Sequence, residues 1–92
     1  MTKTVYIITK YHFYYGIKDI VYISKDYKKA IEILKEYTNN LDNNMGLRLR
    51  EYQYDTVYDI DESKTTIKHI QKEDGCLKQW INGKWRKINW KY

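Results

Sequence analysis

Apolar positions recur with a helical period over residues 26–41, and this stretch predicts the main helix of the chain. A spacing of three and four residues places such side chains on one helical face. They are Tyr27, Ala30, Ile31, Leu34, Tyr37 and Leu41. Ser24 or Asp26 stands before this stripe and can accept hydrogen bonds from the free N–H groups of the first turn. The rest of the chain has strand patterns, so we expect the helix to cover a sheet.

The residues before the helix predict two strands. Positions 3–14 are apolar at both alternating parities, which is typical of a strand buried on both faces or nearly so. Gly16 interrupts this run, and residues 17–23 then form a second strand. Because the connection is short, we expect an antiparallel hairpin.

Beyond the helix, residues 47–60 form a third strand region and residues 65–70 a short fourth strand. The apolar positions of the third region change phase near Arg50 and Glu51, which indicates a bulge, a bend or two separate strands. All four glycines are interpreted as turn residues, because glycine tolerates backbone conformations that other residues avoid. They are Gly16, Gly46, Gly75 and Gly83.

The end of the chain predicts a β-hairpin. Asn82 and Gly83 separate two alternating runs, which is a strong signal for a two-residue turn. This turn pairs Trp80 with Trp85, Gln79 with Arg86, Lys78 with Lys87, and Leu77 with Ile88. Alternation then places Lys78, Trp80, Trp85 and Lys87 on one face, and Leu77, Ile81, Ile88 and Trp90 on the other.

Together these elements predict an α+β fold with an antiparallel or mixed sheet of about five or six strands. The helix at about 26–41 packs on one face, and a hairpin ends the chain. With 92 residues the chain suits one domain, with a ββαββ body at 1–72 and a basic, Trp-rich hairpin at 76–91. The pattern leaves open whether this hairpin joins the main sheet.

The net charge of +5 lies entirely in residues 76–92, because basic and acidic residues cancel before Cys76. The basic residues of this tail are Lys78, Lys84, Arg86, Lys87 and Lys91, and it contains no acid. Such a segment attracts phosphates or an acidic protein surface. It can equally pair with the acidic stretch of the chain itself, at Asp55, Asp59, Asp61 and Glu62.

Two surfaces are candidates for binding. The first is the hairpin, where aromatic rings can stack on bases and cations can hold phosphates. Its residues are Lys78, Trp80, Lys84, Trp85, Arg86 and Lys87. The alternative is a cross-strand Trp pair that closes a small core. The second surface comprises Tyr11, Tyr14, Tyr15, Tyr52, Tyr54 and Tyr58, for which simple sheet packing is the alternative.

No catalytic constellation emerges from the sequence, so we expect no enzyme activity and no cofactor. His12 and His69 each lie in a strand pattern and are interpreted as surface or sheet residues. The acidic group Asp59, Asp61 and Glu62 lacks the alternation and glycine of a calcium loop, which favours a solvated turn over a metal site.

The cellular location expected from the sequence is the cytoplasm. Cys76 is the single cysteine and excludes an internal disulfide, which fits a reducing compartment. A signal peptide and an apolar run near 18 residues are both absent from the pattern, so neither secretion nor membrane association is expected.

Four segments carry a resemblance to a known family. They are Thr-Val-Tyr-Ile-Ile-Thr at 4–9, Ile-Val-Tyr-Ile-Ser at 20–24, Tyr-Lys-Lys-Ala-Ile at 27–31 and Arg-Glu-Tyr at 50–52. Over residues 3–58 the chain resembles small uncharacterised domains of bacteria and their phages, which implies a ββαβ fold without an assigned activity. In type it also resembles phage-encoded inhibitors of host-defence nucleases, such as anti-CRISPR proteins.

These features predict a non-enzymatic binding protein encoded by a phage or mobile element and acting in the host cytoplasm as a monomer or homodimer. It would block a host-defence nucleoprotein complex by steric occlusion. The alternative is a module that binds DNA or RNA directly through the Trp hairpin. A third interpretation is an assembly protein that self-associates through an exposed strand edge.

Overall fold

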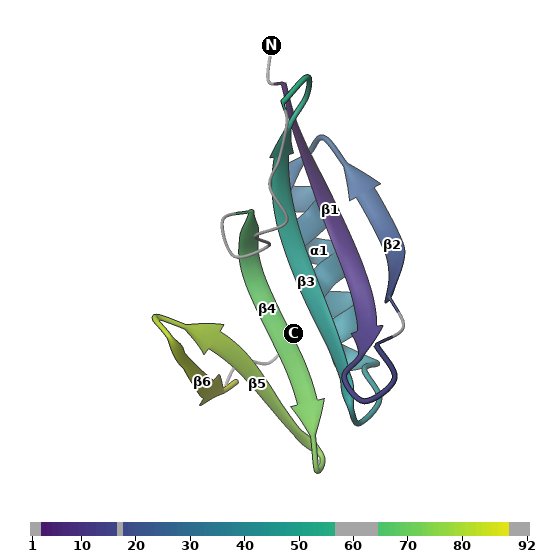
Figure 1. The fold of residues 1–92 in the computed structure, drawn as a ribbon, viewed down its shortest axis with the longest axis vertical. Coiled ribbons are helices and arrows are strands. Elements are labelled where there is room, and N and C mark those ends of the chain that lie inside the picture. Colours follow the sequence, from purple (N-terminus) through teal and green to yellow (C-terminus); the bar gives the residue numbers. More distant parts are fainter. Residues whose placement is uncertain (1–2, 17, 57–64, 89–92) are drawn as a thin grey trace.

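The computed structural model describes residues 3–16, 18–56 and 65–88 of the chain. Its elements are β1 (Thr4–His12), β2 (Lys18–Ser24), α1 (Tyr27–Asn39), β3 (Met45–Gln53), β4 (Thr66–Glu73), β5 (Cys76–Ile81) and β6 (Lys84–Lys87). The strands form one 6-stranded sheet in the order β2-β1-β3-β4-β5-β6 (Figure 1). Every pair of neighbouring strands is antiparallel, so the predicted α+β class is confirmed with an antiparallel sheet.

The C-terminal hairpin extends the main sheet, because β5 pairs with β4. Its register is the predicted one, with Trp80 opposite Trp85 and Lys78 opposite Lys87. Asn82 and Gly83 have φ values of 49° and 80°. Two successive positive φ angles define the type I′ turn, whose twist matches that of the strands it joins.

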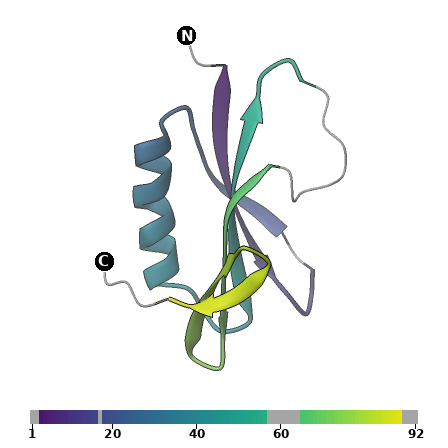
Figure 2. The ribbon, with the colours of Figure 1, turned by 90° about the vertical axis from the view of Figure 1, so that its left-hand side faces the viewer.

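The helix covers one face of the sheet and packs against β1, β2 and β3 (Figures 1 and 2). Asp26 is its N-cap, since one carboxylate oxygen accepts the N–H groups of Lys28 and Lys29 at 2.9 and 3.4 Å. Ser24 instead accepts the N–H of Asp26 at 3.0 Å. Both sequence candidates therefore act at this helix start, but only Asp26 satisfies the N–H groups of the first turn.

The core lies between the helix and the sheet. Its buried residues are Ile8, Ala30, Leu34, Leu41, Leu47, Leu49 and Ile70. Cross-strand pairing joins Ile8 to Leu49 and Leu47 to Ile70, which places these side chains on the face that the helix covers. Leu77 and Ile88 also pack against this core. The opposite face of the sheet carries no helix of the described chain and is called the helix-free face below (Figure 2).

The structure corrects the interpretation of one glycine. Gly16, Gly75 and Gly83 have positive φ angles, as expected of turn residues, whereas Gly46 lies inside β3. Asn44 makes the left-handed turn before this strand, with a φ of 67°. Gly46 pairs with Tyr11 of β1, and its lack of a side chain lets the Tyr11 ring lie across the strand.

The sheet has an irregularity near Arg50, where the sequence predicts a phase change, but it belongs to the neighbouring strand. The pairing of β3 with β4 shifts register between Leu49 and Arg50, while the pairing of β3 with β1 continues unbroken to Gln53. Leu49 faces Lys68 and Arg50 faces Thr66, so the extra residue of this bulge is Ile67 in β4. β3 itself is one regular strand, so the prediction of a bulge, a bend or a break within it is wrong. The strand prediction is wrong at positions 54–56, which follow β3 without strand structure. The predicted strand positions 57–60, together with Tyr58, Trp90 and the acidic turn at 59–63, lie outside the described residues.

Candidate functional site

Cations gather on the helix-free face. The pairing registers place there every strand residue that alternates with a core position. The charged residues among them are Lys18, Arg48, Arg50, Glu73, Lys78 and Lys87. Glu73 is thus the only acid among the described strand residues of this face. The described strand residues of this face therefore carry net positive charge, which comes from strands that are far apart in sequence.

Trp80 and Trp85 form an exposed indole pair on the same face. They lie opposite each other in β5 and β6, with ring centroids 5.3 Å apart and ring planes at 70°. Edge-to-face contact of this kind is favourable, and it covers only part of the aromatic surface of the pair. Trp80 stays 47% exposed and Trp85 37% exposed. The pair therefore offers aromatic surface to a partner, with Lys78 and Lys87 beside it.

The two other cations of the hairpin do not belong to this surface. Arg86 pairs with Gln79 and Lys84 pairs with Ile81, so both alternate with the indole positions. Alternation places Lys84 and Arg86 on the face that bears Leu77 and Ile88. The pairing thus divides the six-residue patch expected from the sequence between the two faces of the hairpin.

A hydrogen-bond network lies next to the indoles. The Tyr11 hydroxyl donates to His69 Nε2, and the Gln71 side-chain amide donates to the Tyr11 hydroxyl oxygen at 2.7 Å. Arg48 Nε also donates to His69 Nε2, at 3.4 Å. A guanidinium can only donate, so Nε2 is the acceptor of the Arg48 bond, and the Tyr11 hydroxyl is then the donor in its bond to the same nitrogen.

The network connects β1 to the C-terminal hairpin through ring contacts. The Arg48 guanidinium carbon lies 4.9 Å from the centroid of the Tyr11 ring. The His69 and Trp85 rings make a T-shaped contact, with a centroid distance of 4.9 Å and an angle of 67° between their planes. The contact of Trp85 with His69 fixes one indole against the sheet. Sequence reasoning missed Arg48 and Gln71, because only the strand pairing shows that they share a face with Tyr11.

Burial raises the pKa of Tyr11 above its ordinary value of 10.0, and the nearby Gln71 and Arg48 oppose this only in part. The neutral hydroxyl is thus retained in the folded protein at pH values where an unfolded tyrosine ionises. Stability from this group is complete below about pH 10 and is lost as the pH rises through the folded pKa.

This shift predicts a difference between the wild type and Tyr11→Phe in alkaline solution. Between about pH 8 and about pH 11 the wild type should lose more free energy of unfolding than the variant. Other tyrosines and lysines titrate in both proteins, so the difference isolates Tyr11. Urea unfolding at stepped pH measures it, and parallel curves would show that burial leaves the Tyr11 pKa unchanged.

The tyrosines of the second candidate surface do not gather in one place. Tyr11 is part of the network, and Tyr52 lies on the helix-free face near the opposite end of β1, beside Val5. Tyr14 and Tyr15 stand in the turn between β1 and β2. Tyr54 follows β3, with the Lys25 ammonium 5.8 Å from its ring centroid. Tyr58 lies outside the described residues.

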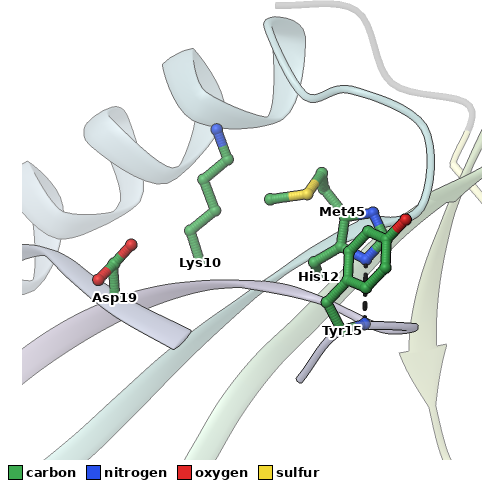
Figure 3. A pocket seen from close by; sticks show the side chains of 5 residues that line it. All are labelled: Lys10, His12, Tyr15, Asp19 and Met45. Carbon is green, nitrogen blue, oxygen red and sulfur yellow. Dashed lines mark hydrogen bonds between the residues drawn. The ribbon is translucent and has the colours of Figure 1, made fainter. Parts of the chain in front are cut away.

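A separate concavity of about 300 Å³ lies at the β1–β2 hairpin, where Lys10, His12, Tyr15, Asp19 and Met45 surround it (Figure 3). His12 Nδ1 accepts the backbone N–H groups of Tyr14 at 3.2 Å and Tyr15 at 3.3 Å. The Tyr15 ring lies 4.4 Å from the imidazole. Lys10, Asp19 and Met45 alternate with the positions of the helix-free face, so this concavity is distinct from the indole surface.

The described residues contain neither a cluster of metal ligands nor a helix that could span a membrane. In residues 3–16, 18–56 and 65–88 no three His, Cys, Asp or Glu side chains come together as a metal site. The sequence candidate Asp59, Asp61 and Glu62 lies outside these ranges. No helix of the described chain has the length and apolar character needed to cross a membrane.

Comparison with known proteins gives no relative from which a function could be transferred. No protein-family model matches the chain, and neither a curated protein nor a solved structure does. The resemblance to small bacterial and phage domains therefore stays a prediction, and function has to be inferred from the indoles, the cations and the network on the helix-free face.

Proposed function

We propose that the chain is a non-enzymatic binding protein whose helix-free face binds nucleic acid. The observation that carries this proposal is the exposed Trp80–Trp85 pair, which stands on one face with Lys78 and Lys87. Indole faces stack on bases of any sequence, and ammonium groups beside them neutralise phosphates. Arg48, Arg50 and Lys18 continue the positive charge across the sheet.

The state of the network supports binding rather than proton transfer. His69 Nε2 already accepts hydrogen bonds from Tyr11 and Arg48, so its lone pair is occupied. The raised pKa of Tyr11 keeps the proton on its hydroxyl. A general base needs a free lone pair within reach of the proton it removes. These groups instead act as a brace that holds the Trp85 ring on the sheet.

The role of a host-defence inhibitor, expected from the sequence, stays a prediction. An acidic protein surface would be attracted by the same cations. Nucleic acid ranks first among the partners because exposed indoles and cations share one face, which supplies stacking and phosphate contacts together.

The proposal predicts that two double variants of equal charge have unequal effects. Lys78→Ala with Lys87→Ala removes cations beside the indoles, whereas Lys84→Ala with Arg86→Ala removes cations from the opposite face. We expect the first pair to weaken binding of a labelled oligonucleotide roughly tenfold at low salt and the second to have a much smaller effect. Fluorescence anisotropy measures both affinities.

Salt dependence provides the control for this comparison. For each phosphate that a variant no longer neutralises, the slope of log affinity against log salt should flatten by about 0.7 for a single strand or about 0.9 for a duplex. Equal reductions of affinity in the two double variants would contradict the assignment to the helix-free face. If the folded wild type binds neither single-stranded nor duplex nucleic acid, the proposed function is wrong and an acidic protein becomes the partner to seek.

A further inference from the structure

The rings of the helix-free face form a continuous track across the strands. From the C-terminal hairpin to the end of β1 the successive rings are Trp80, Trp85, His69, Tyr11 and Phe13. Their centroids are separated in turn by 5.3, 4.9, 5.6 and 6.4 Å. The track therefore joins the Trp hairpin to the tyrosine-rich β1–β2 turn. The sequence analysis treated these two regions as separate binding surfaces.

The properties of this track change along its length. At one end the two indoles are exposed, while in the middle Tyr11 is only 7% exposed and lies under the Arg48 guanidinium. At the other end Phe13 is half-buried, and the exposed Tyr14 ring lies 5.5 Å from it. The track thus has an aromatic surface at each end and a cation between them.

We propose that this track binds an unpaired, single-stranded segment that crosses the strands of the sheet, an inference that rests on the proposed nucleic-acid function. The bases stack on Trp80 and Trp85 at one end and on Tyr14 at the other, while the intervening backbone passes Arg48. Arg48 keeps its bond to His69 and offers its charge to a phosphate.

A duplex cannot use the track in this way. Each base of a duplex is stacked between its neighbours, so its face is closed to a protein ring until the strand is opened. An unpaired strand can turn its bases onto aromatic side chains while its phosphates meet the cations. The spacing of the rings suits a short contact, near the lower end of the roughly 4–16 nucleotides that comparable aromatic surfaces hold.

The test measures the affinity of the full chain for three ligands by fluorescence anisotropy, all at one salt concentration. They are a labelled single strand of about eight nucleotides, the duplex of the same length, and an abasic strand with the same number of phosphates. The single strand should bind at least about tenfold more tightly than either of the others. The abasic strand keeps the charge and removes the stacking, so it separates the two contributions.

Substitutions at the two ends of the track locate the stacking. Trp85→Ala should lower the affinity for the normal strand roughly tenfold and change the affinity for the abasic strand little. Trp85→Phe should keep most of the affinity for the normal strand. Tyr14→Ala should weaken binding more than Tyr15→Ala, because the Tyr14 ring lies beside Phe13, the last ring of the track, whereas Tyr15 lies against His12 and lines the concavity (Figure 3). The abasic measurement in each variant also shows that the protein remains folded and its cations remain in place.

The outcomes separate this inference from the proposed function. Equal affinity for the duplex and the single strand, or an equal effect of Trp85→Ala on the normal and abasic strands, would overturn the stacking track. Salt-sensitive binding would still stand in that case, and with it the proposed function. Absence of binding to all three ligands would overturn both.

Discussion

Replacing Ile8 by Ala should remove a large share of the stability of the protein. Ile8 is completely buried in the core beneath the helix and pairs across strands with the buried Leu49. Truncation loses buried methyl groups and leaves a cavity, which together cost about 2–5 kcal/mol. Domains of this kind have a free energy of unfolding of about 5–15 kcal/mol. Urea unfolding followed by circular dichroism should therefore show a strongly lowered midpoint.

Ile23 supplies the matched control for this prediction. It is the same residue type in the adjacent strand, but it lies on the helix-free face at the sheet edge and is 58% exposed. Ile23→Ala should cost less than about 1 kcal/mol, because little apolar area returns to water. Similar destabilisation by the two variants would mean that the core does not lie between α1 and β1.

The parts of the fold that sequence predicted best are those that local chemistry determines. Asn82 and Gly83 specify a type I′ turn. Once a two-residue turn is placed, it fixes which residues of β5 and β6 face each other. Asp26 begins the helix for an equally local reason, since its carboxylate satisfies N–H groups two and three residues away. Neither inference needs knowledge of distant strands.

The network of the candidate site depends on information of another kind. Tyr11 and His69 are 58 residues apart, and they meet only because β3 lies between β1 and β4 in a particular register. A shift of one residue between β1 and β3 would put Arg48 and Tyr11 on opposite faces, and the same shift between β3 and β4 would separate Arg48 from His69. Alternation within one strand shows which of its residues share a face of the sheet. It does not show which residues of the neighbouring strands lie on that same face.

Gly46 shows the same limit at a single position. In sequence it follows a run of asparagines and resembles a loop residue, yet it is a strand residue selected by the Tyr11 ring that lies across it. Aromatic side chains that cover a glycine on the neighbouring strand are a known way to stabilise a sheet. The close approach is visible only when the partner strand is known. It also explains why Tyr11 is buried although no helix of the described chain covers its face.

Gly46→Ala should therefore destabilise the protein although its backbone is suited to alanine. A Cβ atom at this position would lie 2.5 Å from Tyr11 Cε1 and nearer still to Cζ and the hydroxyl oxygen. The ring must move, which breaks its bonds with His69 and Gln71 and exposes apolar area. We expect a decrease of about 2–4 kcal/mol in the free energy of unfolding, measured in urea.

A double-mutant cycle with Tyr11→Ala tests the cause. Without the ring the added methyl group has room, so Gly46→Ala should then cost little or even stabilise the strand by about 0.5–1 kcal/mol. Gly83→Ala is the control, because its Cβ meets nothing within 4 Å and its strain comes from a φ of 80° alone. Its cost should be the same with and without Tyr11. If Gly46→Ala also lowered the free energy of unfolding by the same amount with and without the Tyr11 ring, the ring would not be the reason for glycine at position 46.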